Sequence, residues 1–298
     1  MYHNPVMLSE SVDGLNINPD GIYVDVTFGG GGHSREILKR LGTYGRLIAF
    51  DQDEDALQNT LDDTRFLLLN NNFRYLKNFL KYYKAVPVDG ILADLGVSSH
   101  QFDKAERGFS TRFESELDMR MNQQQDLSAQ RIVNEYNQQQ LSEVFWHYGE
   151  INNGAQLASG IIKYRSEKEI KTTVDLKEAI SRQIDKKNEI KYLAKVFQAL
   201  RIEANMELDV LKEFLLQALE VLKSQGRLVI ISYHSLEDRL VKNFIKSGNF
   251  NGEIEKDFFG NTKVPFNLIN KKVLIPDESE INENSRARSA KLRIAEKY

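Results

Sequence analysis

The chain has 298 residues, of which 41% are hydrophobic and 28% charged, with a formal net charge of -3 at neutral pH. This length allows one large domain or two smaller ones. The absence of cysteine excludes disulfides and thiolate metal sites, and the slight negative charge argues against a protein that coats nucleic acid by charge alone. No apolar stretch approaches the roughly 20 residues that cross a bilayer. Residues 1–10 also lack the features of a secretory signal, so we expect a cytoplasmic protein that contacts no membrane.

Strand-like and helix-like segments alternate in the first hundred residues. Ser34 is the expected N-cap of the first helix after the first strand. Such alternation is typical of a parallel sheet with helices on both faces, which predicts an α/β fold. Short apolar runs predict strands at 22–26, 46–50, 66–69 and 88–94, and helical spacing predicts helices at 35–41, 56–61 and 73–83.

The pattern changes after residue 99. Residues 100–126 contain few apolar positions and are expected to form a long loop, and helical patterns without a strand follow up to residue 185. The α/β pattern then resumes with a helix at 208–222 and a strand at 227–232. We therefore predict a Rossmann-like domain of residues 1–104 and 206–298, interrupted by an all-helical insertion of residues 105–205. The helical patterns of the insertion cover 128–136, 138–148, 154–166 and 173–185.

Two features are expected near the C-terminus. Ser235 and Asp238 have the spacing of a capping box, which predicts a helix beginning at Ser235. Residues 285–295 partly alternate basic with small or apolar side chains, which predicts a final edge strand with one basic face.

The glycine run at 29–32 follows a predicted strand and precedes a predicted helix. Free N–H groups and the helix dipole at such a turn favour an anionic or carboxylate-bearing ligand. Asp51 lies about 20 residues further on, at the end of the next strand, where a carboxylate can accept both hydroxyls of a ribose. Together these features indicate a nucleoside-containing cofactor. The alternative is that the glycines form only a flexible turn.

Two nucleotide-binding motifs are missing from the turn, and their absence limits the choice of cofactor. The dinucleotide fingerprint G-x-G-x-x-G/A, begun at Gly29, requires glycine or alanine where Ser34 stands, and the P-loop motif is absent. The charge of Asp25, just before the turn, would also repel a pyrophosphate. S-adenosylmethionine (SAM) has no phosphate and carries a cationic sulfonium, so the sequence favours SAM.

Ten motifs are spread along nearly the whole chain: PVML at 5–8, TFG at 27–29, GGHS at 31–34, DQD at 51–53, DLGVSS at 94–99, ERGFS at 106–110, LDMRM at 117–121, VFQALRI at 196–202, SYHSLEDR at 232–239 and RARSA at 286–290. Together they resemble the ribosomal RNA small subunit methyltransferase H family. That resemblance implies a SAM-dependent Rossmann-like enzyme, which methylates N4 of a cytidine, nucleotide 1402, in the decoding centre of 16S rRNA. It also implies 16S rRNA within the 30S subunit as the partner and the insertion as the substrate-recognition domain.

The resemblance also implies a set of cofactor contacts. Phe73 is among them as a ring that packs on adenine, although a core aromatic is an equally compatible interpretation. One departure is Val26, where relatives usually have glycine or a small residue, and a strand position tolerates it. The implied SAM contacts are Gly31, Gly32, His33, Asp51, Phe73, Asp94 and Gln101.

Methyl transfer to N4 of cytosine requires the nitrogen and the methyl carbon to be aligned while the N–H bonds are polarised. Many amino-methyltransferases have Asp/Asn/Ser-Pro-Pro-Tyr/Phe after the fourth strand, but here DLGVSS at 94–99 offers no proline or aromatic ring. The candidate catalytic residues are Asp94, Ser98, Ser99 and His234, at or after strand ends where ligand sites gather. His234 fits a neutral helix-start residue equally well, no general base is identified, and no metal site is predicted.

Candidate phosphate contacts lie in two segments. Acidic residues share the first segment, so a solvated surface of mixed charge is the alternative there. Two other function classes stay open: a nucleotide-dependent oxidoreductase, which would need the missing fingerprint, and a non-catalytic ribosome-assembly factor that retains a SAM-binding fold. The oligomeric state, including a homodimer, is also open. The basic candidates are Arg107, Arg112 and Arg120 after the fourth strand, and Arg286, Arg288, Lys291 and Arg293 near the C-terminus.

Overall fold

The computed structural model describes residues 5–184, 186–254, 256, 259–260, 262, 264–270 and 272–298, without the side chains of Ser99, Ala105 and Lys186. The chain divides into two compact units. Met1–Gly96 and Leu208–Tyr298 form one, which we call the sheet unit, and Val97–Glu207 form the other, which we call the helical unit. Each unit has its own hydrophobic core.

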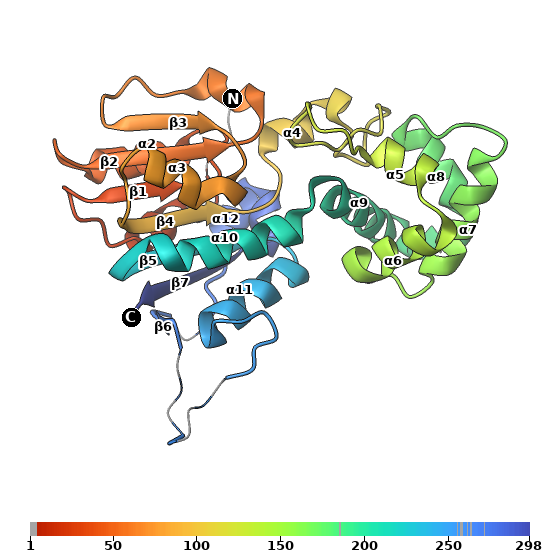
Figure 1. The fold of residues 1–298 in the computed structure, drawn as a ribbon. Coiled ribbons are helices and arrows are strands. Elements are labelled where there is room, and N and C mark those ends of the chain that lie inside the picture. Colours follow the sequence, from red (N-terminus) through yellow and green to blue (C-terminus); the bar gives the residue numbers. More distant parts are fainter. Residues whose placement is uncertain are drawn as a thin grey trace. The chain divides into compact units, whose positions relative to one another are not determined.

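The sheet unit is built on one mixed sheet, which has seven strands in the described residues, in the order β3-β2-β1-β4-β5-β7-β6 (Figure 1). β1 to β5 run parallel, and β7 runs antiparallel to β5 and β6. The chain moves outward from β1 to β3 and then returns to place β4 beside β1, which makes a topological switch point. The strands are β1 Ile22–Asp25, β2 Arg46–Asp51, β3 Phe66–Asn70, β4 Val88–Asp94, β5 Leu222–Ser232, β6 Phe266–Leu268 and β7 Lys291–Lys297.

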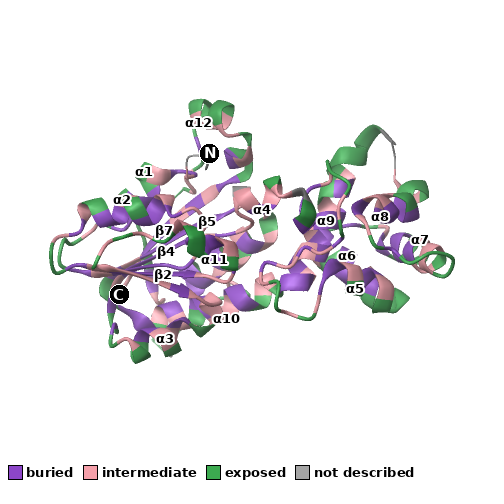
Figure 2. Cartoon of the chain, turned by 90° about the horizontal axis from the view of Figure 1, so that it is seen from above, coloured by how far each residue is buried: buried purple, intermediate pink, exposed green. Residues whose placement is uncertain are grey.

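Helices cover both faces of this sheet, as Figure 2 shows by the buried strands between them. Side chains alternate along each parallel strand. Val24 and Ile91 pack in the cluster that holds Phe214, whereas their neighbours Tyr23 and Leu92 pack in a second cluster on the other face. The predicted α/β fold, Rossmann-like with a helical insertion, is confirmed. The helices of this unit are α1 Leu8–Gly14, α2 Gly32–Arg40, α3 Leu76–Tyr82, α10 Glu207–Val221 (whose first residue belongs to the helical unit), α11 Ser235–Ser247 and α12 Glu278–Glu283.

The helical unit packs its helices around a separate apolar cluster. Its longest helix, α9, was not anticipated, because the polar residues at its start obscure the apolar spacing of Leu193, Val196 and Leu200. Within the described residues, no helix has the length and apolar character needed to cross a bilayer. The helices are α4 Ser99–Asp103, α5 Ala129–Glu135, α6 Gln138–Gly149, α7 Gly154–Arg165, α8 Thr173–Ile180 and α9 Glu189–Asn205.

The segment expected to be a long loop, 100–126, is built into the helical unit. It begins with α4, and two of its few apolar side chains, Leu117 and Met119, are fully buried. Asn205 at the end of α9 ties the segment down, because its Nδ2 donates to the Met119 carbonyl at 2.8 Å and its Oδ1 accepts from the Met121 N–H at 2.7 Å. The segment is thus part of the helical unit, Val97–Glu207, which contains the predicted insertion of residues 105–205.

Gly108 in this segment has a positive φ of 71°, and a Cβ there would collide with the carbonyl oxygen of Glu116. We expect Gly108→Ala to lower the free energy of unfolding of the helical unit by about 2–4 kcal/mol, because backbone strain and backbone overlap add. Urea unfolding followed by the fluorescence of Trp146, the chain's one tryptophan, on α6, measures this loss. Gly260→Ala, monitored by circular dichroism, is the control for positive φ alone, since its Cβ meets nothing within 4 Å. Equal stability of the Gly108→Ala variant and the wild type would contradict the packing of this loop.

The predicted C-terminal edge strand is wrong in both its start and its place. Ser285–Ser289 form a short 3-10 helix, and β7 begins at Lys291. β7 pairs with β5 on one side and with the short β6 on the other, so β6 is the edge. β6 has only three residues, too few to show a strand pattern in the sequence, and so the second neighbour of β7 was not foreseen.

Candidate active site

The carboxyl ends of β1, β2 and β4 meet at the switch point of the sheet. Asp25, Asp51 and Asp94 are the last residues of these three strands. Ligands of open α/β sheets bind in the crevice at such a point, outside the carboxyl ends of the strands. The predicted glycine turn lies at the same edge, between β1 and α2, so this edge is the candidate active site.

The glycine turn is shaped by close backbone packing. Gly31 is the N-cap of α2 with a positive φ of 74°, and a Cβ there would lie 2.8 Å from the ring of Phe28. A Cβ on Gly32 would overlap the ring of Pro5, so the N-terminal segment lies directly on the turn. The first N–H groups of α2 have no partner within the helix, as at every helix N-terminus, and can donate to a ligand.

Ser34 is not the N-cap, contrary to the prediction. It lies inside α2, and its hydroxyl donates to Asp25 Oδ2 at 2.7 Å, while the Thr27 N–H donates to Oδ1 at 3.1 Å. Asp25 is fully buried, and burial raises its pKa, outweighing the opposing effect of His33 and of these hydrogen bonds. The Asp25 carboxyl is therefore used to hold the turn on the end of β1.

Asp51 is fixed beneath the glycine turn. Its Oδ2 accepts the Gly29 N–H at 2.7 Å, and its Oδ1 accepts the Asp53 N–H at 2.9 Å. Burial raises its pKa to about 6, although the same two hydrogen bonds act in the opposite direction. Each carboxylate oxygen retains a second lone pair, so the side chain can still accept hydrogen bonds from a ribose. This geometry fits the predicted cofactor.

Asp94 connects the ends of three neighbouring strands. Its N–H donates to Thr27 Oγ1 at 2.7 Å, and its Oδ1 accepts the hydroxyl of Tyr233, just after β5, at 2.7 Å. Burial raises the pKa of Asp94 to about 7, with a further rise from the charges of Glu237 and Glu280 and a lowering by the Tyr233 hydrogen bond. Asp94 is thus held in place and can exchange a proton near neutral pH.

His33 lies in the first turn of α2, beside Asp94. Its buried ring places Nε2 3.1 Å from the Val6 carbonyl, which only accepts, so Nε2 carries the proton. Nδ1 lies 3.9 Å from Asp94 Oδ2, too far for a direct hydrogen bond. Burial lowers the pKa of His33. A neutral His33 therefore anchors the N-terminal segment to the glycine turn.

His234, and not Ser235, is the N-cap of α11, which corrects the predicted capping box by one residue. Its Nδ1 accepts the Glu237 N–H at 3.4 Å, and Glu237 Oε2 accepts the N–H of His234 at 3.4 Å and that of Tyr233 at 2.9 Å. Asp238, the predicted partner of Ser235, instead binds Arg293. His234 thus serves the helix start, and a role in catalysis stays a prediction.

Phe73 lies three residues beyond the carboxyl end of β3, as the first residue of the 3-10 turn Phe73–Tyr75. Its ring packs edge-on against Phe214 of α10, with centroids 5.3 Å apart and planes at 73°. The side chain is only partly buried. Packing against the core therefore accounts for one side of the ring, and contact with adenine stays a prediction.

Ser98, Ser99 and Gln101 belong to the helical unit. Ser98 caps α4: its hydroxyl accepts the Gln101 N–H at 3.2 Å, and Gln101 Oε1 accepts the Ser98 N–H at 3.0 Å. Gln101 is buried. The side chain of Ser99 lies outside the described part of the chain. The predicted roles of these three residues toward cofactor and base stay predictions.

Two of the basic residues predicted after β4 support their own loop. Arg107 is buried and donates to the carbonyls of Arg120 and Met121 at 2.9 and 3.1 Å. Arg120 pairs with Asp118 at 2.5 Å. Arg107 is thus held within its own loop, and its contact with a phosphate stays a prediction. Arg112 is exposed.

The C-terminal basic residues are partly neutralised within the sheet unit. Lys291 and Arg293 both pair with Asp238, at 3.2 and 2.7 Å. Burial alone would raise the pKa of Asp238, but these two cations outweigh it and lower the pKa. Arg286 is half-buried and Arg288 is exposed. Arg288 is therefore the most accessible of the four predicted phosphate contacts here.

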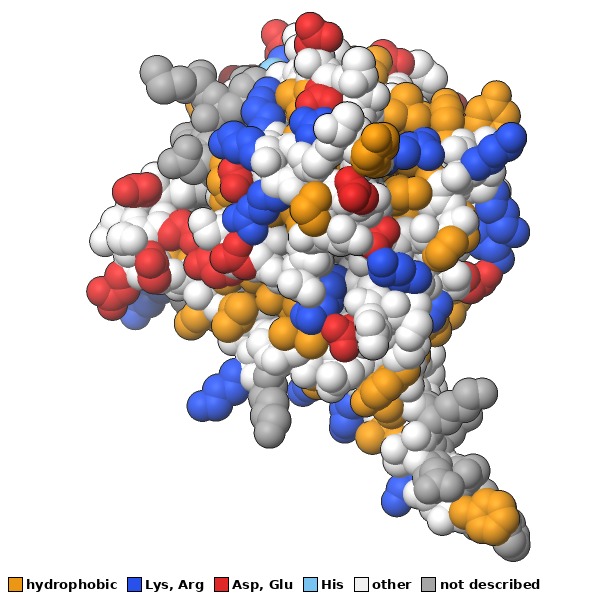
Figure 3. All heavy atoms as spheres, turned by 90° about the vertical axis from the view of Figure 1, so that its left-hand side faces the viewer, with side chains coloured by type: hydrophobic (Ala, Val, Ile, Leu, Met, Phe, Trp, Pro, Cys, Tyr) orange, Lys and Arg blue, Asp and Glu red, His pale blue; other side chains and the backbone are white. Residues whose placement is uncertain are grey.

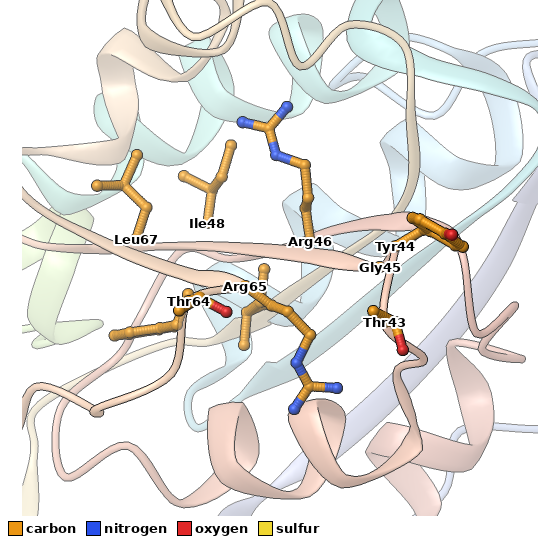
Figure 4. A pocket seen from close by; sticks show the side chains of 10 residues that line it. Thr43, Tyr44, Gly45, Arg46, Ile48, Thr64, Arg65 and Leu67 are labelled. Carbon is orange, nitrogen blue, oxygen red and sulfur yellow. The ribbon is translucent and has the colours of Figure 1, made fainter.

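A pocket at the opposite end of the sheet does not resemble a charged binding site. It is lined by residues 43–48 and 64–67, at the amino ends of β2 and β3, and Arg46 and Arg65 point to opposite sides of it (Figure 4). Arg65 is already paired with Asp63 at 2.6 Å. Figure 3, which faces the left-hand side of Figure 1, shows basic and acidic side chains interspersed. The carboxyl-end edge therefore remains the candidate site.

Thr27 and Tyr233 belong to the site geometry but were not anticipated. Tyr233 directly follows β5, and Thr27 lies two residues beyond the end of β1. Both are at the edge where ligand sites gather, and that position was the available signal. The types of these two residues gave no signal, because threonine and tyrosine are also ordinary residues next to a sheet.

The raised pKa of Asp51 predicts a pH dependence of SAM binding. The ionised carboxylate is the better acceptor for ribose hydroxyls, and below about pH 6 the free protein protonates it. SAM affinity should therefore fall as pH falls, by about tenfold from pH 7.5 to pH 5. Isothermal titration calorimetry across this range measures the effect. Asp51→Asn is the matched control, and a wild-type profile as flat as that of Asp51→Asn would contradict the assignment.

The sequence of this chain is similar to sequences of known methyltransferases. The model of the MraW methylase family matches residues 1–298. A protein of Flavobacterium johnsoniae named ribosomal RNA small subunit methyltransferase H is 62% identical over 99% of this chain and 98% of its own length. One of the same name from Christiangramia forsetii is 59% identical over the same shares. Among solved structures, an rRNA methylase from Streptococcus thermophilus aligns over 97% of this chain and 94% of its own, at 14% identity and a TM-score of 0.44.

Proposed function

Because the chain belongs to the MraW methylase family, we propose that it transfers the methyl group of SAM to N4 of a cytidine in 16S rRNA, at nucleotide 1402. The observation that carries the proposal is the arrangement of the sheet unit at its switch point. A glycine turn, Asp51 and Asp94 occupy the carboxyl ends of adjacent strands there. The assembled 30S subunit is the proposed form of the substrate, which would place the reaction in the cytoplasm.

The cofactor half of the proposal rests on the turn and on Asp51. The N–H groups of the first turn of α2 suit the carboxylate end of SAM, and the Asp51 carboxylate, held by Gly29 and Asp53, suits its ribose. Gly32, against which Pro5 packs, gives the turn no side chain that would block a ligand. Bound SAM would supply an electrophilic methyl group.

The acceptor half rests on Asp94. The lone pair of the N4 nitrogen is delocalised into the cytosine ring, so an acceptor for its N–H hydrogen raises its nucleophilicity and then takes the proton that the product loses. Asp94 Oδ1 is already bonded to Tyr233, and Oδ2 is the oxygen proposed to accept from N4. A pKa of about 7 suits this role, because such a group exchanges a proton readily at neutral pH.

The proposed recognition of the RNA rests on accessible basic residues and on the insertion. A base must leave its stack to reach a buried carboxylate. The helical unit is the proposed substrate-recognition domain, with Ser98 and Ser99 as candidate base contacts and Arg112 as a phosphate contact. Arg288 is the second exposed arginine among the predicted contacts, on the sheet unit.

A transfer assay tests the proposal. Purified protein, SAM labelled in its methyl group, and 30S subunits that lack the modification should give labelled 16S rRNA, whereas 50S subunits should remain unlabelled. Free 16S rRNA as a third substrate separates recognition of the particle from recognition of naked RNA. SAM binding without transfer to either small-subunit substrate would refute the catalytic proposal and favour the non-catalytic assembly factor.

A further inference from the structure

We propose that Tyr233 is a positioning residue for the methyl transfer: its hydroxyl holds Asp94 so that Oδ2 faces the amino group of the target base. The Tyr233 hydroxyl donates to Asp94 Oδ1 at 2.7 Å. This inference rests on the proposed function of Asp94 and adds a residue that the predicted site did not include.

Tyr233 is itself fixed along its length. Its N–H donates to Glu237 Oε2 at 2.9 Å, in the first turn of α11. Its ring lies against Gly96, where a Cβ would stand 3.4 Å from Cδ2 and where φ is 99°. Tyr233 also packs against the buried cluster on one face of the sheet. Because the ring is held in this way, the position of its hydroxyl is fixed, and at that position the hydroxyl bonds to Asp94.

Asp94 is consequently restrained at two points. Thr27 Oγ1 accepts the N–H of Asp94, and the Tyr233 hydroxyl donates to Oδ1 of its carboxylate. Neither residue bonds to the other carboxylate oxygen, Oδ2. His33 Nδ1 is 3.9 Å from Oδ2 and, with Nε2 protonated toward Val6, has no proton to offer it. Oδ2 is therefore the acceptor available for a substrate N–H.

The chemical step that this arrangement serves is balanced without a further reagent. Asp94 Oδ2 takes the proton that N4 loses when N4 bonds to the methyl carbon and the carbon–sulfur bond breaks, with that electron pair remaining on sulfur. The products are N4-methylcytosine, S-adenosylhomocysteine and a protonated Asp94, which returns its proton to solvent.

The Tyr233 hydrogen bond also favours the ionised form of Asp94. Four other charged or titratable groups among the described residues act on Asp94: His33 on α2, Asp25 on β1, Glu237 on α11 and Glu280 on α12. The acidic groups raise the Asp94 pKa and Tyr233 opposes them. Removing the Tyr233 hydroxyl should therefore raise the pH at which Asp94 titrates.

Tyr233→Phe tests this with a readout that does not require activity. In protein labelled with 13C at the aspartate carboxyl carbons, the Asp94 resonance, assigned by its loss in Asp94→Asn, should titrate near pH 7 in the wild type. In Tyr233→Phe its midpoint should move upward by about one pH unit. Tyr136→Phe is the matched control, because it removes a similar tyrosine–carboxylate bond, 2.7 Å to Glu203, within the helical unit. An unchanged Asp94 midpoint in folded Tyr233→Phe overturns the inference.

The kinetic measurement then tests the role in the reaction. At pH 7, Tyr233→Phe should lower kcat about tenfold, with a smaller loss above about pH 8.5, and should change the Kd for SAM by no more than about twofold. The acid limb of kcat should follow the Asp94 midpoint. A moved midpoint with an unmoved limb would overturn the positioning role. Wild-type protein that transfers no methyl group would instead refute the proposed function, while the carboxyl titration still tests the Tyr233–Asp94 bond.

Discussion

Asp51→Ala is expected to weaken SAM binding by about 30- to 1000-fold, or about 2–4 kcal/mol, because two hydrogen bonds from the ribose hydroxyls to a carboxylate are lost. The fold should survive. The folded-state pKa of Asp51, about 6, lies above its ordinary value of 3.8. Its contribution to stability is therefore present at low pH and lost as pH rises through about 6, so the ionised side chain is already unfavourable for folding at neutral pH.

Calorimetric titration of SAM into the variant measures this loss, and circular dichroism checks the fold. Asp63→Ala is the matched control, since this carboxylate lies before β3 at the opposite end of the sheet and pairs with Arg65. It should bind SAM as the wild type does. Wild-type affinity in Asp51→Ala would remove the ribose assignment and leave the glycine turn as the only support for a nucleoside site.

Asp94→Asn is expected to lower kcat by about 10²- to 10³-fold, within the roughly 10²- to 10⁴-fold that a positioned proton acceptor contributes. The amide keeps an oxygen that can accept from Tyr233, but it loses the charge and the ability to take a proton. Asp94 is also a predicted cofactor contact, so the Kd for SAM should rise, by no more than about tenfold. Single-turnover transfer to 30S subunits, with the Kd measured separately, distinguishes the two effects.

Asp89→Asn provides the comparison for this variant. Asp89 lies near the amino end of the same strand, β4, where its Oδ2 accepts the Ile22 N–H at 2.9 Å. It should leave turnover unchanged. If Asp94→Asn keeps the wild-type kcat at every pH from 6 to 9 while Asp89→Asn does the same, Asp94 is not the acceptor and the proton goes directly to water.

The cofactor end of the site could be predicted from the sequence because its signals are local. The glycine run, Asp51 and the strand ends are each recognised from neighbours along the chain, and the sheet then brings them to one edge. The Asp94–Tyr233 contact could not be predicted in this way, because 139 residues separate the partners and only the pairing of β4 with β5 joins them. The N-cap of α11 was missed since histidine is an uncommon capping residue beside a serine that fits the pattern.

The helical unit and the C-terminus were harder for a related reason. The loop after β4 has few apolar residues, yet its Leu117 and Met119 are fully buried. They pack in one cluster with side chains of α9, which lies far away in the sequence. The sequence predicts β7 as an edge strand because its outward neighbour, β6, has only three residues and gives no strand pattern. Nothing in the sequence around Arg107 indicates the two backbone carbonyls to which it donates. In each case tertiary partners, and not local propensity, decided the outcome.

The central claim is that this site methylates the N4 nitrogen of a single cytidine. Its most direct test is mass spectrometry of the nucleosides and nuclease fragments of 16S rRNA after reaction of unmodified 30S subunits with the protein and SAM. The account predicts N4-methylcytidine in one fragment, the one that contains nucleotide 1402, and none with Asp94→Asn over the same time. Methylation at carbon 5, on a ribose hydroxyl or on another base would contradict it.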